Sequence, residues 1–215
     1  MPQSPTSRWL KLKARACEKA LSLLDVPCAL IDPRLMVDHK WHQDFILHLA
    51  NVLRPRAYLE LGIFHCGLFN KMIPYAETLI GVDLDPKAGS FMTKATKASF
   101  VCARTDDFAA MLRRDPMAFD MIFIDADHSK EAVEADFRNF MSFLNPHGLL
   151  LLHDTHPLDL AATERLRCDD GHAAIGSLSR QCDEWEMITI PVHPGLTMCR
   201  KRTTQLKWQE PVPQP

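Results

Sequence analysis

Hydrophobic positions in the first 55 residues recur at the spacing of helices. Two such stretches lie near Trp9–Leu24 and His39–Leu53, and Pro27 and Pro33 separate them. Apolar residues spaced three and four apart form one face of a helix, whereas proline interrupts helical structure. We therefore expect the chain to begin with two helices.

The chain from Arg56 onward alternates short apolar runs with helix-length segments. One of those segments, Ser129–Leu144, repeats apolar residues at helical spacing and predicts a helix. Runs that are apolar throughout, such as Met121–Ile124, are typical of strands in a parallel sheet with both faces covered. The predicted strands are Ala57–Leu61, Thr78–Asp83, Ser99–Ala103, Phe119–Asp125 and Gly148–His153.

The last two apolar runs follow a different pattern. Five residues join Glu186–Ile190 to Leu196–Arg200, which is too short for a parallel crossover and predicts an antiparallel hairpin. The predicted fold is a doubly wound α/β domain, with a mostly parallel seven-stranded sheet and an antiparallel last strand. We expect a helical segment, 1–55, packed on a core domain, 56–204, and a disordered Pro-rich tail at 205–215.

Composition narrows the function classes. With 215 residues, 47% hydrophobic and 24% charged, the chain has the size and composition of one globular domain. A net charge of −2 disfavours nucleic acid as a partner, and no apolar run approaches the ~20 residues that span a membrane. Seven cysteines without a C-x-x-C pair, and a start unlike a secretory signal, predict reduced thiols in the cytoplasm.

The loop after the first predicted strand has the features of a ligand-binding turn. It runs from Glu60 to Gly67, and its glycines let the backbone turn sharply and approach a ligand. In a doubly wound sheet this loop lies at the carboxyl edge, where ligands bind. Asp83 ends the next strand, a position from which an acid accepts hydrogen bonds from ribose hydroxyls. Because the loop lacks G-x-G-x-x-G, we do not expect a dinucleotide.

Acidic residues also end two later strands. Asp125 follows an apolar strand, and His153 and Asp154 end the next one. The carboxyl ends of neighbouring parallel strands meet, so these carboxylates would repel one another unless they are protonated or share a cation. A divalent cation resolves the conflict; the alternative is that they are plain loop or capping carboxylates.

Taken together, these motifs resemble class I S-adenosylmethionine-dependent methyltransferases. The loop resembles their acidic-x-Gly-x-x-x-Gly pattern, except that Cys66 replaces the second glycine and Gly67 follows it. The stretches Asp125–His128 and His153–Thr155 resemble metal-dependent O-methyltransferases of the catechol and caffeoyl-CoA type, and more closely the macrocin-type sugar enzymes.

The resemblance implies a cofactor, a metal, a base and a substrate class. It implies that His128 is the general base, acting on the hydroxyl of a small molecule such as a sugar or natural product. Relatives often form a homodimer, and the oligomeric state of this chain stays open. Thr105 and Asp106 are also suited to cap the helix that follows them. The implied metal ligands, for magnesium or else iron or manganese, are Asp125, His153 and Asp154. The implied S-adenosylmethionine contacts are Glu60, Gly62, Gly67, Asp83, Leu84, Thr105, Asp106 and Asp125.

Two other functions remain open. Residues His128, His153 and Asp154 would also suit iron in a hydroxylase-like enzyme on the same fold, as in cephalosporin hydroxylases. Cys66 in the glycine loop is compatible with a non-catalytic subunit that binds S-adenosylmethionine without turnover.

Overall fold

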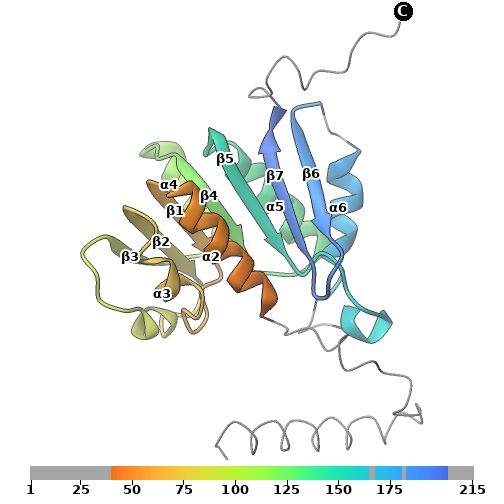
Figure 1. The fold of residues 1–215 in the computed structure, drawn as a ribbon, viewed down its shortest axis with the longest axis horizontal. Coiled ribbons are helices and arrows are strands. Elements are labelled where there is room, and N and C mark those ends of the chain that lie inside the picture. The colour runs from red at the N-terminus through yellow and green to blue at the C-terminus, as the bar shows by residue number, and fades with distance from the viewer. Residues whose placement is uncertain (1–39, 165–167, 181–182, 203–215) are drawn as a thin grey trace, which may run out of the picture. The chain divides into compact units, whose positions relative to one another are not determined.

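The computed structural model describes residues 40–164, 168–180 and 183–202. The first predicted helix and the Pro-rich tail lie outside these residues. In the part described, a seven-stranded sheet carries helices on both faces (Figure 1). None of the helices described is both long and apolar enough to cross a membrane.

The sheet has the predicted architecture. Its order is β3-β2-β1-β4-β5-β7-β6; the first five strands pair in parallel, and β7 is antiparallel to both β5 and β6. The doubly wound fold with one antiparallel strand is therefore confirmed. The strands are β1 Ala57–Leu61, β2 Thr78–Asp83, β3 Ala98–Cys102, β4 Phe119–Ile124, β5 Leu144–His153, β6 Trp185–Ile190 and β7 Leu196–Lys201.

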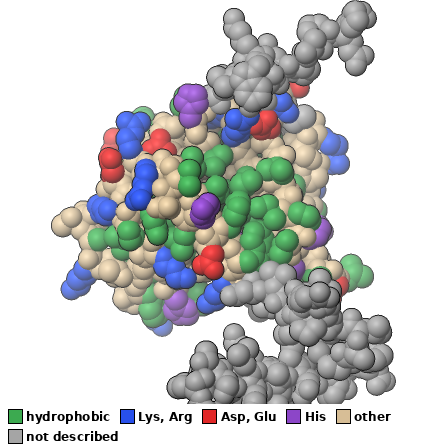
Figure 2. All heavy atoms as spheres, in the orientation of Figure 1, with side chains coloured by type: hydrophobic (Ala, Val, Ile, Leu, Met, Phe, Trp, Pro, Cys, Tyr) green, Lys and Arg blue, Asp and Glu red, His purple; other side chains and the backbone are tan. Residues whose placement is uncertain are grey.

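Helices cover the two faces of the sheet with separate hydrophobic clusters. One cluster joins the sheet to α4, α5 and α6, and the other joins it to α2, α3 and η3. The helices are α2 Trp41–Leu53, α3 Phe69–Met72, η3 Ala88–Phe91, α4 Thr105–Arg114, α5 Lys130–Met141, η4 Leu160–Thr163 and α6 His172–Ser179. Figure 2 shows hydrophobic side chains gathered on the face that carries α2, and on β6 Ile188 is 62% exposed.

The predicted helix over Ser129–Leu144 is too long at its end. Helix α5 stops at Met141, and Leu144 begins β5, where it pairs with Phe119 of β4. Leu144 still packs in the same hydrophobic cluster as the helix residues, so an apolar residue stands there at helical spacing although the helix has ended. Strand β5 consequently starts four residues before the predicted Gly148.

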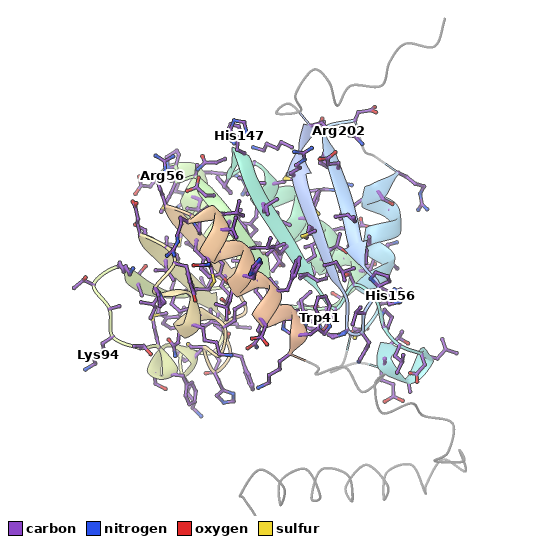
Figure 3. The ribbon with its side chains drawn as sticks, in the orientation of Figure 1. Trp41, Arg56, Lys94, His147, His156 and Arg202 are labelled. Atoms are coloured by element: carbon purple, nitrogen blue, oxygen red, sulfur yellow. The ribbon has the colours of Figure 1, made fainter. Side chains whose placement is uncertain are left out.

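The strand order reverses between β1 and β4, which creates a crevice at the carboxyl edge of the sheet. Strands β1, β2 and β4 all end there, and β5 ends there at His153. Trp41 and His156 lie toward this edge, whereas Arg56 and His147 lie toward the opposite one (Figure 3). The residues that follow these strand ends are therefore brought together around one crevice.

Candidate cofactor pocket and metal centre

The loop after β1 holds three residues in the left-handed region of the backbone. Gly62 has φ +85° and donates its N–H to the Val82 carbonyl at 2.8 Å. Phe64 and Cys66 have φ of 44° and 56°, although side chains disfavour this region. Cys66 thus takes the conformation that the usual glycine would supply, and its thiol is buried against the Ala88 carbonyl at 3.4 Å.

Asp83, at the end of β2, ties this loop to the sheet. One carboxylate oxygen accepts the N–H of Phe64 at 2.8 Å, and the other accepts the N–H of Asp85 at 2.9 Å. Each oxygen has a second lone pair that can accept a further hydrogen bond. The side chain is therefore fixed in place and still able to accept from ribose hydroxyls.

A pocket of about 740 Å³ opens beside this loop. Its volume lies within the range of small-molecule and cofactor sites. Three predicted cofactor residues do not line it: Glu60 is buried, and Gly67 and Asp106 are exposed outside the pocket. The predicted site residues that line it are Gly62, Asp83, Leu84, Thr105, Asp125, His128, His153 and Asp154.

Thr105 and Asp106 begin helix α4, but Arg104 is the N-cap residue and no side chain caps the helix. Asp106 forms an ion pair with Arg104 at 3.1 Å and accepts the N–H of Asp107 at 3.0 Å. Arg104 and Thr105 both face the pocket, so Asp106 is one residue further from it than expected. A cofactor contact by Asp106 stays a prediction.

Glu60 is a buried acid that does not line the pocket. It is 3% exposed, and the Tyr58 hydroxyl donates a 2.6 Å hydrogen bond to its Oε2. Burial raises the pKa of Glu60 to about 8, and the charge of Asp125 adds to the rise. The hydrogen bond from Tyr58 opposes it. Near neutral pH the Glu60 side chain is therefore largely protonated.

The raised pKa makes Glu60 a source of pH-dependent stability. Between its ordinary pKa of 4.5 and about 8, the unfolded chain binds fewer protons than the native one, so stability falls as pH rises. The loss is at most about 1.4 kcal/mol per pH unit. Because Gln cannot ionise but still accepts from Tyr58, Glu60→Gln should flatten the decline.

The measurement is urea unfolding of the wild type and Glu60→Gln at several pH values from 5 to 9. Glu77→Gln is the matched control, because Glu77 is exposed. Parallel stability curves for the wild type and Glu60→Gln would contradict the expected result.

The segment after β4 is held so that it turns into α5 at once. The Asp125 N–H donates to the Leu61 carbonyl at 2.8 Å, which ties the end of β4 to β1. Asp127 accepts the N–H of Ser129 at 2.8 Å, and Ser129 is the N-cap of α5. His128 lies between these two fixed points and lines the pocket together with Asp125.

Two carboxylates and two imidazoles meet at the end of the pocket. Nδ1 of His153 lies 2.9 Å from Oδ1 of Asp125 and 3.2 Å from Oδ1 of Asp154. His128 contacts Oδ2 of Asp154 through Nδ1, and its Nε2 lies 3.5 Å from Oδ1 of Asp125. The strand ends therefore bring together all four residues that the sequence placed in the metal and base roles.

Donor atoms of Asp125, His128 and Asp154 lie within 4.8 Å of one another. Two carboxylates and one imidazole form a donor set that suits magnesium, manganese, iron or zinc. The trio contains His128 where the resemblance implied His153 as the third ligand. His153 instead turns its Nδ1 to Asp125 and its other nitrogen toward α2.

The charges of the cluster compensate one another. Burial lowers the pKa of His128, but the hydrogen bond and charge of Asp154, with that of Asp125, outweigh it and raise the pKa to about 8. Burial likewise lowers the pKa of His153, and the charge and hydrogen bond of Asp125 raise it more. Burial alone would raise the pKa of Asp154, but the neighbouring imidazoles of His128 and His153 outweigh it, so the pKa is lowered. The Asp154 carboxylate is therefore ionised and attracts positive charge.

His42, on helix α2, belongs to the cluster although the sequence did not point to it. Its Nδ1 lies 3.2 Å from Nε2 of His153, and the two ring centroids are 4.0 Å apart. His42 shares the buried face of α2 with Ile46 and Ala50. A histidine on the apolar face of a predicted helix was the available signal, but its partner lies 111 residues away.

Comparisons with known proteins agree with the fold described above. Residues 59–155 match a family model described as a methyltransferase domain. A curated relative, the uncharacterized protein y4gI of Sinorhizobium fredii, is 27% identical over 175 residues, which cover 69% of this chain. The match spans only 18% of the length of that relative.

Solved structures with similar folds include three methyltransferases. An O-methyltransferase of Bacillus cereus, in complex with SAH, has a TM-score of 0.64 at 14% identity and covers 94% of this chain and 93% of its own. TomG of Streptomyces achromogenes, an O-methyltransferase in complex with SAM, has a TM-score of 0.60 at 18% identity, and the match covers 86% of this chain and 96% of TomG. The SAH-bound methyltransferase PaMTH1 of Podospora anserina has a TM-score of 0.61 at 14% identity, and the match covers 94% of this chain and 98% of PaMTH1. At these identities the likeness concerns the fold.

Proposed function

We propose that the chain is a class I S-adenosylmethionine-dependent methyltransferase that methylates a hydroxyl oxygen of a small molecule with the help of a divalent cation. The observation that carries the proposal is the continuity of the pocket. One end is lined by Asp83, Leu84 and Thr105, and the other ends at the carboxylates of Asp125 and Asp154. A nucleoside at the first end would direct its sulfonium methyl group toward the second.

In the proposed reaction, some pocket residues bind the methyl donor and another accepts the proton. Asp83 would accept hydrogen bonds from the ribose, and Gly62, which lines the same pocket, would lie beside the methionine portion of the donor. S-adenosylmethionine supplies an electrophilic methyl group: its sulfur–carbon bond breaks as the new oxygen–carbon bond forms. The proton of the acceptor hydroxyl would pass to His128, which lines the pocket beside both carboxylates.

A cation at this site would be held by the carboxylates of Asp125 and Asp154, with His128, the third member of the donor set, acting as the proton acceptor rather than as a ligand. When bound, it would neutralise the two carboxylates and lower the pKa both of a nearby acceptor hydroxyl and of His128. Holding the acceptor close to the methyl group and excluding water would supply much of the rate. The proposed substrates are therefore hydroxylated small molecules, including sugars and natural products.

Replacing His128 by alanine tests the proposed proton acceptor. We expect turnover to fall by roughly 10²–10⁴-fold, because a general base contributes about that much, while the affinity for S-adenosylmethionine stays nearly unchanged. Single-turnover kinetics and calorimetric titration with the donor measure the two effects separately. Unchanged turnover would remove His128 as the base, and a loss of cation affinity without a kinetic defect at saturating cation would make it a ligand.

Ligand-dependent stability tests the proposal before any substrate is known. A ligand at ~100 times its dissociation constant adds roughly 2.7 kcal/mol to the free energy of unfolding, so melting curves with S-adenosylmethionine, with magnesium and with both should shift upward. A panel of hydroxylated acceptors can then be screened by mass spectrometry for a gain of one methyl group. No shift with the donor would refute the proposal; binding without any transfer would favour the non-catalytic subunit.

The pair of imidazoles beside the carboxylates supports a second candidate, an iron-dependent hydroxylase-like enzyme. His128 and His153 both approach Oδ1 of Asp125, and two histidines with one carboxylate form a set that suits iron. Loading the protein anaerobically with iron or with magnesium separates the two. Methyl transfer with magnesium supports the first function, and oxygen consumption that requires iron supports the second.

A further inference from the structure

His42 contacts the cluster from outside the pocket. It is 5% exposed and does not line the pocket, so it cannot touch the methyl donor or the acceptor there. Its ring lies beside both Phe123 and His153, with centroids 6.4 Å and 4.0 Å away. A buried polar ring that packs beside an aromatic side chain and a second imidazole needs a specific reason to be histidine.

We propose, on the basis of the function proposed above, that His42 is a positioning residue that fixes the ring of His153 so that Nδ1 of His153 faces Asp125. The contacts form a line of three side chains. Nδ1 of His42 lies 3.2 Å from Nε2 of His153, and Nδ1 of His153 lies 2.9 Å from Oδ1 of Asp125.

The hydrogen-bond partner of one imidazole nitrogen determines how the ring is oriented and whether the other nitrogen donates or accepts. A histidine ring can turn by 180°, which exchanges a nitrogen for a carbon at each contact. With His42 at Nε2 and Asp125 at Nδ1, both nitrogens of His153 have a partner in only one of the two orientations. A side chain that contacts a metal ligand orients that ligand and tunes its affinity. Here His153 contacts the proposed ligand Asp125, and His42 acts on it through His153.

Helix α2 gives His42 a fixed position from which to act. Ile46 and Ala50 follow it at four-residue intervals and are fully buried against the sheet. At the start of the helix, the indole N–H of Trp41 donates to the His193 carbonyl at 2.9 Å. The helix is therefore held at its first turn and along its inner face, so the place of His42 does not depend on a mobile loop.

The first experiment reads the ring of His153 directly, with no cation present. Imidazole ¹⁵N resonances are recorded for the wild type, His42→Phe and His42→Asn, together with His48→Phe as the control on the exposed side of the same helix. We expect the resonances of His153 to shift or broaden in His42→Phe. In His42→Asn, whose amide occupies the place of Nδ1, they should return toward the wild type. Unchanged His153 resonances in His42→Phe would overturn the proposal.

The second experiment measures cation binding, with Mn²⁺ titrated and followed by electron paramagnetic resonance. We expect His42→Phe to weaken Mn²⁺ binding by about 10–100-fold and His42→Asn to recover most of it. The affinity for S-adenosylmethionine and the behaviour of His48→Phe should not change. Equal losses in the Phe and Asn variants, or a loss of donor binding with them, would mean that His42 serves only to pack the helix.

The two experiments separate this inference from the function on which it rests. If the wild type binds no Mn²⁺, the proposed cation site is refuted, and the resonances still decide whether His42 positions His153. If the wild type binds Mn²⁺ and His42→Phe binds it equally well, the function stands and the role of His42 is refuted. His42→Asn keeps the test available if the Phe variant fails to fold.

Discussion

Replacing Asp154 with asparagine is expected to weaken divalent-cation binding at least about 100-fold and to reduce turnover with it, because the substitution removes one of the two negative charges at the site. Asp154 is 8% exposed and contacts both His128 and His153. These contacts leave its carboxylate ionised in the folded protein. Titration with Mn²⁺ and steady-state kinetics at saturating S-adenosylmethionine measure the two losses.

Asparagine is the informative replacement because of the backbone at this position. Asp154 has φ 55°, in the left-handed region that asparagine tolerates better than most residues with a side chain. Alanine would add backbone strain to the loss of the carboxylate, whereas asparagine keeps the size of the side chain and replaces only the carboxylate by a neutral amide. The protein should therefore still fold, and donor binding should persist.

Asp169→Asn is the matched control. Asp169 also has a left-handed backbone, with φ 46°, and its side chain accepts a hydrogen bond from the N–H of Asp170 at 2.9 Å, outside the cluster. We expect no change in cation affinity in this variant. Wild-type Mn²⁺ binding in Asp154→Asn would remove Asp154 from the proposed ligands.

A second large effect is expected from Gly62→Ala. A Cβ at this position would lie 2.0 Å from the carbonyl oxygen of Asp125, which no real contact allows, and φ +85° adds strain for any side chain. The loop after β1 and the end of β4 would have to separate. We expect a loss of roughly 3 kcal/mol or more of stability and no measurable binding of S-adenosylmethionine.

Gly67→Ala provides the contrast within the same loop. The nearest atom to a Cβ at Gly67 is Nε2 of Gln43 at 3.9 Å, an ordinary contact, and Gly67 does not line the pocket. Stability and donor affinity should change little, by less than about 1 kcal/mol and about threefold. Equal losses in both variants, measured by urea unfolding and calorimetry, would show that the close approach at Gly62 is not what shapes the pocket.

The sequence was sufficient to predict the sheet and the residues that follow its strands. Asp83, Asp125 and Asp154 come directly after or at the end of apolar runs, and parallel strands bring such residues to one edge. The structure confirms this edge and the antiparallel β7. Pocket residues could therefore be predicted without knowing any contact.

Burial and chance periodicity explain what the sequence did not predict. Leu144 continued the helical spacing of α5, yet Asn145-Pro146 follows it, and proline does not fit the interior of a helix. Glu60 was expected to approach the cofactor, but it shares a face of β1 with Tyr58 and is buried with it. Spacing alone gives the position of an acid along a strand, not the environment on the side to which it points.

The contact between His42 and His153 joins positions 111 residues apart. In a partly folded chain with only the strands from β1 to β4 in place, Asp125 would be positioned, but Asp154 and His153, which follow or end β5, would not. Loss of a cation from this site would accordingly accompany opening of the whole domain rather than fraying of one loop. A tightly held ion would thus link the N-terminal and C-terminal parts of the domain into a single cooperative unit.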